Sequence, residues 1–318
     1  MPAGFSTKRA HPAFTQWLRA TGLATMIGLF VGAAPAAPVE AAALGVVDDG
    51  NGAPDIVVFE KWLGCPVQQL LLYTPRDSWH EIAHPQPTIR RFARLHKPAV
   101  WSIGMIPPHA SLQQAATGAY DGIYVSAARA LAEVHPNPDG TIFIRPGWEL
   151  NGDWSPWAAS KQPDAYAATY RHIVDAFRSV SSRFRFEWNI NFGREMDPAL
   201  AYPGDRYVDV VGMDFYWFPE WQGSDPDRAF AALRDDRHGL AYIQRFAAAH
   251  GKPVAFSEWG VQGDNAGPLI EHVRRWIDAN HILYHNYWNS DADYPGRLSG
   301  GRWPHAGAAF RKAFCGRP

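Results

Sequence analysis

Eight short apolar runs rich in β-branched and aromatic residues recur along the chain, and amphipathic helical segments separate most of them. We interpret these runs as strands over Ile56–Glu60, Gln69–Tyr73, Ala99–Ile103, Thr141–Arg145, Arg185–Asn189, Val208–Met213, Pro253–Ser257 and Ile282–Tyr287. Helical spacing of apolar residues predicts helices over Ile123–Val134, Asp164–Val180, Arg228–His250, Leu269–Ala279 and Pro304–Phe314. Eight strands alternating with helices predict a closed (β/α)8 TIM barrel of the α/β class. An open doubly wound sheet is the alternative, although the chain lacks a glycine-rich phosphate loop.

The N-terminal region has the pattern of an export signal. Lys8, Arg9 and Arg19 precede a short apolar run over 23–31, and small residues follow it. The run is too short to predict a stable membrane anchor. We therefore expect a secreted or periplasmic protein, with an uncleaved membrane tether as the alternative.

The remaining length suits a single barrel domain. We predict a signal peptide over residues 1–41, a linker over 42–54 and the barrel over 55–318. The net charge of the whole chain is -1, and loss of the signal would make it about -3. A mildly acidic chain has no electrostatic reason to bind nucleic acid, so none is expected as a partner.

The cysteine and histidine patterns restrict other kinds of site. Cys65 and Cys315 are expected to pair, because export leads to an oxidising compartment and a barrel brings its first strand beside its last helix. Two buried free thiols are the alternative. No histidine or cysteine spacing indicates a metal site, and we expect neither a metal nor another cofactor.

Two glutamates lie where a barrel of this kind carries its chemistry, at the C-terminal ends of strands. Glu149 follows the fourth predicted strand in RPGWELNGDWSPW, and Glu258 follows the seventh in KPVAFSEWG. Glycoside hydrolysis requires such a pair: one acid protonates the leaving oxygen, while the other attacks or stabilises the anomeric carbon. A solvated or salt-bridged residue is the alternative reading of either glutamate taken alone.

Aromatic and amide side chains accumulate at the same strand ends. Sugar rings stack on indoles and hydrogen-bond to amides, so this distribution favours a polysaccharide cleft, whereas core packing is the alternative for aromatic clusters. The residues expected to bind substrate are Arg145, Trp148, Asn151, Trp154, Trp157, Asn189, Trp217, Trp259 and Trp288. Arg145 could equally neutralise a buried carboxylate, and Asp214 is assigned a structural or supporting role.

These stretches resemble glycoside hydrolase family 26 of clan A, the β-mannanases and related endo-β-glycanases. RPGWELNGDWSPW is similar to the family pattern RPxHEMNGxWxxW, while YPGDRYVDVVGMDFYW and FSEWG are similar to its sixth strand and its nucleophile strand. The resemblance implies that Glu149 is the acid/base, that Glu258 is the nucleophile and that Tyr216 hydrogen-bonds the nucleophile. It also implies that Trp154 and Trp288 line the cleft near the cleavage point.

One residue departs from the family pattern. Trp148 stands where the family usually has His, and an indole can donate one hydrogen bond but can neither accept one nor titrate near neutral pH. The departure leaves the substrate open among β-mannan, β-glucan and a bacterial exopolysaccharide. We expect burial to raise the pKa of Glu149, and Tyr216 to keep Glu258 ionised.

The function predicted from these features is that of a monomeric, retaining endo-β-glycosidase that uses two glutamates in a double displacement. The first alternative is a non-catalytic polysaccharide-binding or export-accessory protein on the same barrel. The second is a retaining glycosidase of another clan A family, whose acid/base normally follows Asn; the flanking NG-W-W residues favour family 26.

Overall fold

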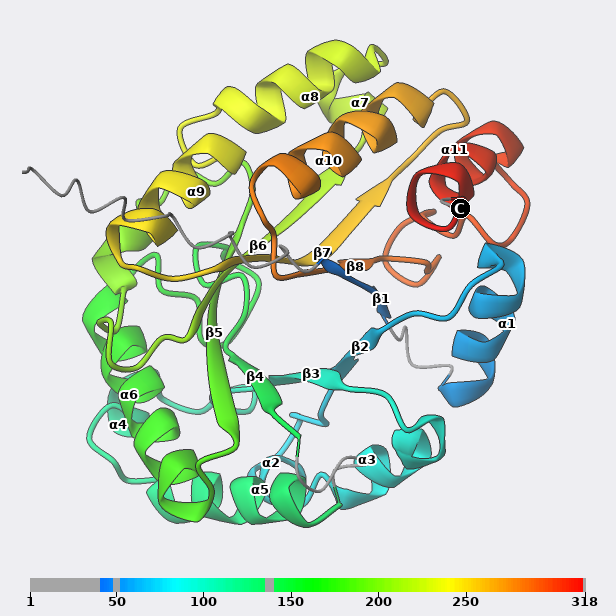
Figure 1. Cartoon of the computed structure of the whole chain (residues 1–318). Helices are drawn as coiled ribbons and strands as arrows, with labels where there is room; N and C mark the ends of the chain where they lie inside the picture. Colours follow the sequence, from blue (N-terminus) through cyan, green and yellow to red (C-terminus); the bar gives the residue numbers. More distant parts are fainter. Residues whose placement is uncertain (1–40, 48–51, 135–139, 317–318) are drawn as a thin grey trace, which may run out of the picture. The chain divides into compact units, whose positions relative to one another are not determined.

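The structure is a computed structural model that describes residues 41–47, 52–134 and 140–316. Its eight strands form a closed barrel in chain order, and every neighbouring pair is parallel (Figure 1). The strands are β1 (Ala43–Val47), β2 (Gln69–Tyr73), β3 (Ala99–Ile103), β4 (Ile142–Pro146), β5 (Phe184–Asn191), β6 (Val210–Trp217), β7 (Val254–Val261) and β8 (Tyr284–Tyr287). The predicted (β/α)8 barrel is confirmed.

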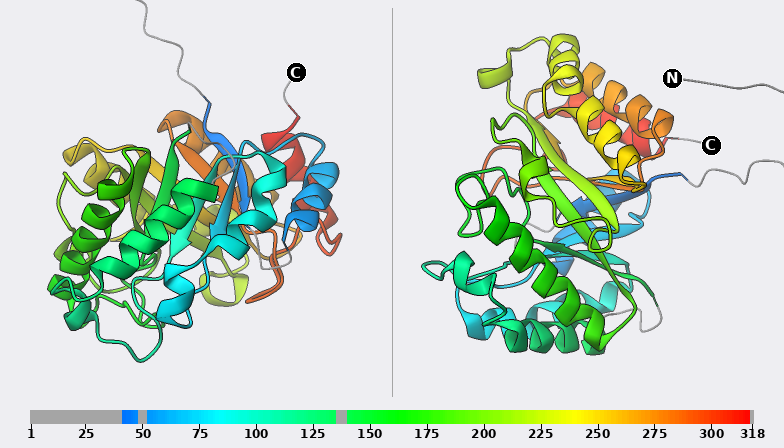
Figure 2. Two further views of the ribbon diagram at one scale, coloured as in Figure 1. Left: turned by 90° about the horizontal axis from the view of Figure 1, so that it is seen from below. Right: turned by 90° about the vertical axis from the view of Figure 1, so that its left-hand side faces the viewer.

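Helices surround the barrel and connect successive strands (Figures 1 and 2). They are α1 (Ala53–Leu63), α2 (Trp79–Ala83), α3 (Gln86–Phe92), α4 (Leu112–Ala115), α5 (Asp121–Val134), α6 (Pro163–Val180), α7 (Pro219–Gln222), α8 (Pro226–Asp235), α9 (Leu240–Ala249), α10 (Gly267–Ala279) and α11 (Pro304–Phe314), with short 3₁₀ turns at Ala93–Leu95 and Pro198–Ala201. In α6, buried residues such as Tyr166, Tyr170, Ile173 and Phe177 recur every three or four positions, which gives the helix one apolar face toward the sheet. No helix in the described ranges is long and apolar enough to cross a membrane.

The start of the barrel differs from the prediction. The segment expected as the first strand, Ile56–Glu60, lies inside α1, and the first strand is Ala43–Val47, within the range expected as a linker. Ile56 and Phe59 are buried, whereas Val57 and Val58 are 53% and 59% exposed. This is helical spacing, and the β-branched content of the segment concealed it.

The predicted helix Arg228–His250 is two helices, α8 and α9. Asp236 ends the first one: its side chain accepts a hydrogen bond from the backbone N–H of His238 at 3.0 Å, and its carbonyl accepts one from Gly239 at 3.0 Å. A Cβ at Gly239 would lie 2.2 Å from the carbonyl oxygen of Leu233, so the turn requires glycine.

Two hydrophobic cores hold the barrel together. The larger core lies between the strands and the surrounding helices. The smaller one includes Val47, Leu71, Val100, Val210 and Ala255, which come from β1, β2, β3, β6 and β7. Since these strands are distributed around the barrel, their side chains can meet only on its inside, as in other barrels of this type. The inside is therefore filled, and substrate can approach only at the ends of the strands.

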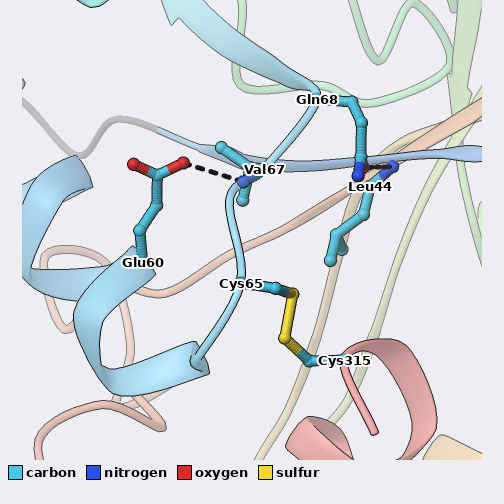
Figure 3. The surroundings of a disulfide bond; sticks show 6 residues. All are labelled: Leu44, Glu60, Cys65, Val67, Gln68 and Cys315. Atoms are coloured by element: carbon cyan, nitrogen blue, oxygen red, sulfur yellow. Dashed lines mark hydrogen bonds between the residues drawn. A yellow bond between two sulfur atoms is a disulfide. The ribbon is translucent and has the colours of Figure 1, made fainter. Parts of the chain in front are cut away.

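A disulfide joins Cys65, just after α1, to Cys315 at the end of α11 (Figure 3). The two residues are 250 positions apart in the sequence, and their Cα atoms are 5.9 Å apart. Beside the disulfide, Glu60 accepts a hydrogen bond from the backbone of Val67, and Gln68 accepts one from the backbone of Leu44 in β1. The disulfide thus closes a loop that contains nearly all of the barrel, which restricts the unfolded chain.

Candidate active site

A cleft of about 1200 Å³ opens where the strands end. Residues at or just beyond the C-terminal ends of β2, β4, β5, β6, β7 and β8 line it, among them Tyr73, Glu149, Asn191, Tyr216, Glu258 and Trp288. The two predicted carboxylates therefore face one cavity. This is the end of a (β/α)8 barrel at which catalytic residues are found.

An irregularity in β7 directs Glu258 into this cleft. Successive residues of a regular strand point to opposite faces. Yet both Ser257 and Glu258 bond to partners inside the barrel: Ser257 donates to Glu187, and Glu258 accepts from Tyr73. The pairing of β7 with β8 shifts its register between Phe256 and Trp259, which allows both side chains to face inward. Such bulges commonly re-aim side chains beside active sites.

Three donors from three other strands surround the Glu258 carboxylate. Tyr73 of β2 donates to Oε1 at 2.5 Å, Tyr216 of β6 donates to Oε2 at 2.6 Å, and the Arg145 guanidinium of β4 forms an ion pair with Oε1. The Glu258 backbone N–H donates to Asp214 at 3.0 Å. The carboxylate is thereby fixed in one orientation.

Arg145 is fully buried and joins this carboxylate to others below the cleft. It donates to Asp214 at 2.7 Å and to Ser102 at 2.9 Å, in addition to Glu258. Burial by itself would raise the pKa of Glu258, but the Arg145 charge and the two tyrosine hydroxyls hold that pKa below its ordinary value. Burial also raises the pKa of Tyr73 and of Tyr216, so both keep the protons that they donate.

Glu149, unlike Glu258, lies in a strained turn that follows β4. Its φ of 53° lies in the left-handed region, which non-glycine residues rarely adopt, and Gly147 has a φ of 57°. A Cβ at Gly147 would lie 2.2 Å from the sulfur of Met105, so glycine is required there. The backbone N–H of Glu149 donates to Asn189 Oδ1 at 2.9 Å, which secures the strained residue.

The orientation of the Asn189 amide follows from its other partners. Its nitrogen donates to Asp214 at 2.8 Å and to Glu187 at 3.1 Å, so its oxygen faces Glu149. Glu187 is fully buried in the barrel and also accepts from Tyr284 at 2.6 Å. The network of buried carboxylates therefore positions both cleft glutamates.

Within the described part of the chain, the donors that contact the Glu149 carboxylate are neutral. Asn191 donates to Oε1 at 2.5 Å and Trp154 donates to Oε2 at 3.1 Å. Burial, with a further contribution from the nearby Glu258 charge, raises the pKa of Glu149 to about 7, because these two hydrogen bonds and the more distant Arg145 compensate only in part. The predicted directions of both pKa shifts are confirmed.

Four of the predicted site residues line the cleft together with the two glutamates: Trp148, Trp154, Tyr216 and Trp288. Trp148 packs between Tyr73 and Trp157, with ring centroids at 5.3 and 4.7 Å, and its indole lies beside Arg145 at 5.5 Å. Trp148, the residue that departs from the family pattern, thus covers the ion pair between Arg145 and Glu258 on the side of the cleft.

The other six residues expected to bind substrate do not line the cleft, and that part of the prediction is corrected. They are Arg145, Asn151, Trp157, Asn189, Trp217 and Trp259, all 4% exposed or less. The three indoles donate to protein groups instead: to the Trp148 carbonyl, the Gly223 carbonyl and His285. Asn151 bonds both the N–H and the carbonyl of Asn191 at 2.8 Å. These residues lie behind the cleft lining and hold the residues that form it.

Tyr73, Glu187 and Asn191 are among the residues of this site that sequence reasoning missed. Tyr73 is the last residue of a correctly predicted strand, so the rule that found Glu258 would also have found it. Glu187 lies within β5, where no local signal distinguishes it from a surface residue. No cluster of His, Cys, Asp and Glu among the described residues has an arrangement that could hold a metal ion.

Comparison with known proteins agrees with this geometry. The model of Glycosyl hydrolase family 26 matches residues 112–251, which include Glu149. Endoglucanase H of Acetivibrio thermocellus is 29% identical over 194 residues, which are 54% of this chain and 20% of that protein. Mannan endo-1,4-β-mannosidase of Bifidobacterium adolescentis is 31% identical over 160 residues, 46% of this chain and 16% of that protein. The chain thus matches about a fifth of the length of these curated relatives.

Solved structures share the fold. The catalytic domain of the endo-β-1,4-mannanase from Bacillus sp. JAMB-750 has a TM-score of 0.63 at 18% identity, covering 86% of this chain and 85% of that one. The modular endo-β-1,4-mannanase of Cellulomonas fimi has a TM-score of 0.60 at 22% identity, covering 85% and 71%. The match to the family model assigns residues 112–251 to glycoside hydrolase family 26, and the solved structures show that the barrel as a whole shares the fold of family 26 mannanases.

Proposed function

We propose that this protein is a retaining endo-β-glycosidase that hydrolyses a β-linked polysaccharide. One observation carries the proposal: two glutamates face one cleft, and their surroundings move their pKa values in opposite directions. Near neutral pH one is available as a proton donor and the other as an anion. Divergent pKa values of this kind assign the acid and base roles in hydrolases.

In the first step the ionised Glu258 attacks the anomeric carbon and forms a glycosyl ester. The bond from that carbon to the leaving oxygen breaks, and protonated Glu149 transfers its proton to this oxygen. Tyr73, Tyr216 and Arg145 hold the attacking carboxylate in place. Glu258 loses its negative charge when it forms the ester. Arg145 still contacts the Asp214 carboxylate at that stage, so the buried positive charge of Arg145 stays compensated.

In the second step Glu149, now ionised, removes a proton from a water molecule. The resulting hydroxide equivalent attacks the anomeric carbon, the ester bond breaks, and Glu258 leaves as a carboxylate. Two inversions restore the original configuration. Asn191 and Trp154 stabilise the anionic form of Glu149 that exists between the two steps.

The named relatives support a β-1,4-linked backbone as the substrate, since one is an endoglucanase and the other a mannan endo-1,4-β-mannosidase. We propose the coarser class for this chain: a β-mannan, a β-glucan or a bacterial exopolysaccharide. The Trp148 substitution supports the last of these, because the hydrogen-bonding group that the family pattern has at this position is replaced by an indole.

Reducing-sugar release on mannan, mixed-linkage glucan, cellulose, xylan and bacterial exopolysaccharide tests the proposal. Wild type should cleave one polymer, while Glu149→Gln and Glu258→Gln should both be inactive on it. Proton NMR of the first product should show the β-anomer before mutarotation. The α-anomer would refute retention. Polymer binding without cleavage by the wild type would instead support the non-catalytic accessory protein.

We also propose that the protein acts outside the cytoplasm. The export-signal pattern over residues 1–41 supports this, and so does the disulfide, which persists in oxidising compartments. N-terminal sequencing of the protein recovered from the medium or periplasm should find a start near Ala42. An intact Met1 on protein that remains in the cytoplasm would refute the proposal.

A further inference from the structure

The charges that line the cleft are unevenly distributed. Three arginines line it, Arg76, Arg91 and Arg194, although the whole chain has a net charge of -1. They follow β2, lie in α3 and follow β5, so all three belong to the half of the rim built on β2 to β5, the lower half of the barrel in Figure 1. The half built on β6 to β8 contributes the acids Glu258 and Asp293 and several aromatic residues, among them Phe218, Trp221, Trp288 and Tyr294. Aromatic residues line both halves of the rim, whereas the arginines that line the cleft belong to one half.

Two of these arginines each lie over an indole that adjoins Glu149, since Trp148 precedes Glu149 in the chain and Trp154 donates a hydrogen bond to its carboxylate. The guanidinium carbon of Arg76 lies 5.1 Å from the Trp148 ring centroid, and that of Arg194 lies 4.3 Å from the Trp154 centroid. Cation–π contact occupies the face of a guanidinium and leaves its in-plane N–H groups free to donate. Among the described residues neither arginine has a carboxylate within ion-pair distance. Their donors are therefore available to a ligand.

The acids of the cleft do not neutralise this pair of arginines. The negative charge of Glu258 is already compensated by its ion pair with Arg145 inside the barrel. The pKa of about 7 leaves Glu149 largely uncharged in mildly acidic solution. Asp293 follows β8, on the other half of the rim. An excess of positive charge consequently remains next to the acid/base.

The stacking also limits what Trp154 can do. Arg194 covers one face of its ring, and a Cβ at Gly152 would lie 2.5 Å from the indole carbons, so the ring edge rests on the chain. A neutral glycan would gain most from a bare indole face. Here Arg194 covers one face of the Trp154 indole. A substrate bound beside this indole therefore meets the forked N–H donors of a guanidinium, whose geometry suits a carboxylate.

We propose that the substrate is an anionic polysaccharide whose carboxylates bind Arg76 and Arg194 in the cleft that holds Glu149. The shared chemistry is the carboxylate, carried either by a uronic acid in the chain or by a pyruvate ketal on it. This inference deepens the proposed function and rests on it. Arg76 and Arg194 are assigned to specificity and take no part in bond cleavage.

The test compares charged and neutral forms of the same backbone. Three pairs serve as probes: carboxymethyl with hydroxyethyl cellulose, glucuronoxylan with its carboxyl-reduced form, and a pyruvylated, glucuronate-containing bacterial exopolysaccharide with its carboxyl-reduced form. Mild acid removes the pyruvate alone, which distinguishes the two carboxylate sources. Binding is measured by affinity electrophoresis in the Glu149→Gln background, and cleavage by reducing ends in the wild-type background.

We expect at least one charged polymer to bind about tenfold more tightly than its neutral partner, and this preference to disappear in 0.5 M NaCl. Arg76→Gln and Arg194→Gln should each weaken binding of the charged form by about threefold, in the range of solvent-exposed ion pairs, and leave binding of the neutral form unchanged. Arg228→Gln removes an equal charge from a side chain that is 90% exposed and does not line the cleft, and it should change neither.

The possible outcomes distinguish failure of the anionic-substrate proposal from failure of the proposed hydrolase function. Equal binding of charged and neutral forms in all three pairs, or a preference that both arginine variants retain, would overturn the anionic substrate even if a neutral polymer is cleaved. Arginine-dependent binding of a charged polymer that the wild type never cleaves would support the carboxylate site and overturn the hydrolase.

Discussion

Glu149 and Glu258 reach one cleft from opposite halves of the barrel, yet their surroundings have little in common. Glu258 lies in a strand, and its carboxylate contacts a guanidinium and two tyrosine hydroxyls from three other strands. Glu149 lies in a strained turn, and its carboxylate contacts one amide and one indole. A directly contacting charge therefore helps to compensate the burial of Glu258, whereas the groups that contact Glu149 are neutral dipoles.

This difference teaches that two identical side chains receive their chemical roles from their neighbours. Both carboxylates are removed from water, and burial raises the pKa of a carboxylate unless charges or donors oppose it. At Glu258, Arg145 and the two tyrosine hydroxyls together outweigh burial, whereas at Glu149 the more distant Arg145 and two neutral donors offset it only in part. The structure thus assigns the anion to β7 and the proton to the turn after β4.

The largest expected effect is the loss of activity when either glutamate is replaced. A substrate whose leaving group needs no proton then distinguishes the two residues. On the polymer, Glu258→Gln and Glu149→Gln should each lower kcat/KM by about 10³-fold or more. With a 2,4-dinitrophenyl glycoside, whose leaving group needs no proton, Glu149→Gln should still release a burst of phenolate and Glu258→Gln should not. Stopped-flow absorbance measures the burst. A burst from Glu258→Gln instead would reverse the assignment.

Stability should respond to the same substitutions with opposite signs. The raised pKa of Glu149 means that its ionisation destabilises the fold increasingly as pH rises from about 4.5 to about 7, so Glu149→Gln should stabilise the protein at pH 8, by about 1 kcal/mol, and have less effect at pH 4.5. The lowered pKa of Glu258 contributes stability above pH 4.5, which Glu258→Gln should lose, at about 2 kcal/mol. Denaturant titrations at both pH values measure this. Equal signs at pH 8 would contradict the comparison.

Removing one of the two hydroxyl donors to Glu258 should reduce the difference between the pKa values of the two glutamates. Tyr73→Phe should raise the pKa of Glu258 and move the acidic limb of the kcat/KM profile to higher pH, by about half a unit, with a loss of about tenfold at the optimum. Tyr120→Phe is the matched control, because it deletes a hydroxyl that donates to Gln114 outside the cleft. An unshifted acidic limb in Tyr73→Phe would show that Arg145 alone sets the pKa.

The smallest effect is expected on the Glu149 side. Trp154→Phe removes the indole donor that favours the ionised acid/base, so the basic limb, expected near pH 7, should move up by a few tenths of a unit. Trp221→Phe is the control: Trp221 is 74% exposed in the cleft wall, and its substitution should change KM without moving the limb. A downward shift in Trp154→Phe would contradict the proposed role of the indole.

Several site residues were predicted wrongly because strand periodicity was not applied at the strand ends. In β6, Tyr216 faces the cleft, so the next residue, Trp217, faces the helices and is 2% exposed. Trp259 likewise follows Glu258 and packs on Phe310 and Phe314 of α11. Alternation would have removed both from the cleft. The bulge that turns Ser257 and Glu258 to the same side has no such local signal.

Local pattern was sufficient for seven of the eight strands, for the association of the two glutamates with β4 and β7 and for the family resemblance, since each depends on residues close together in the chain. The three-dimensional packing was needed to show which glutamate keeps its proton, which tryptophans reach the cleft and where the cleft arginines lie. Arg145 and Glu258 are 113 residues apart in the sequence. A pKa depends on burial and on charges within a few ångströms, and only the closed barrel brings those groups together.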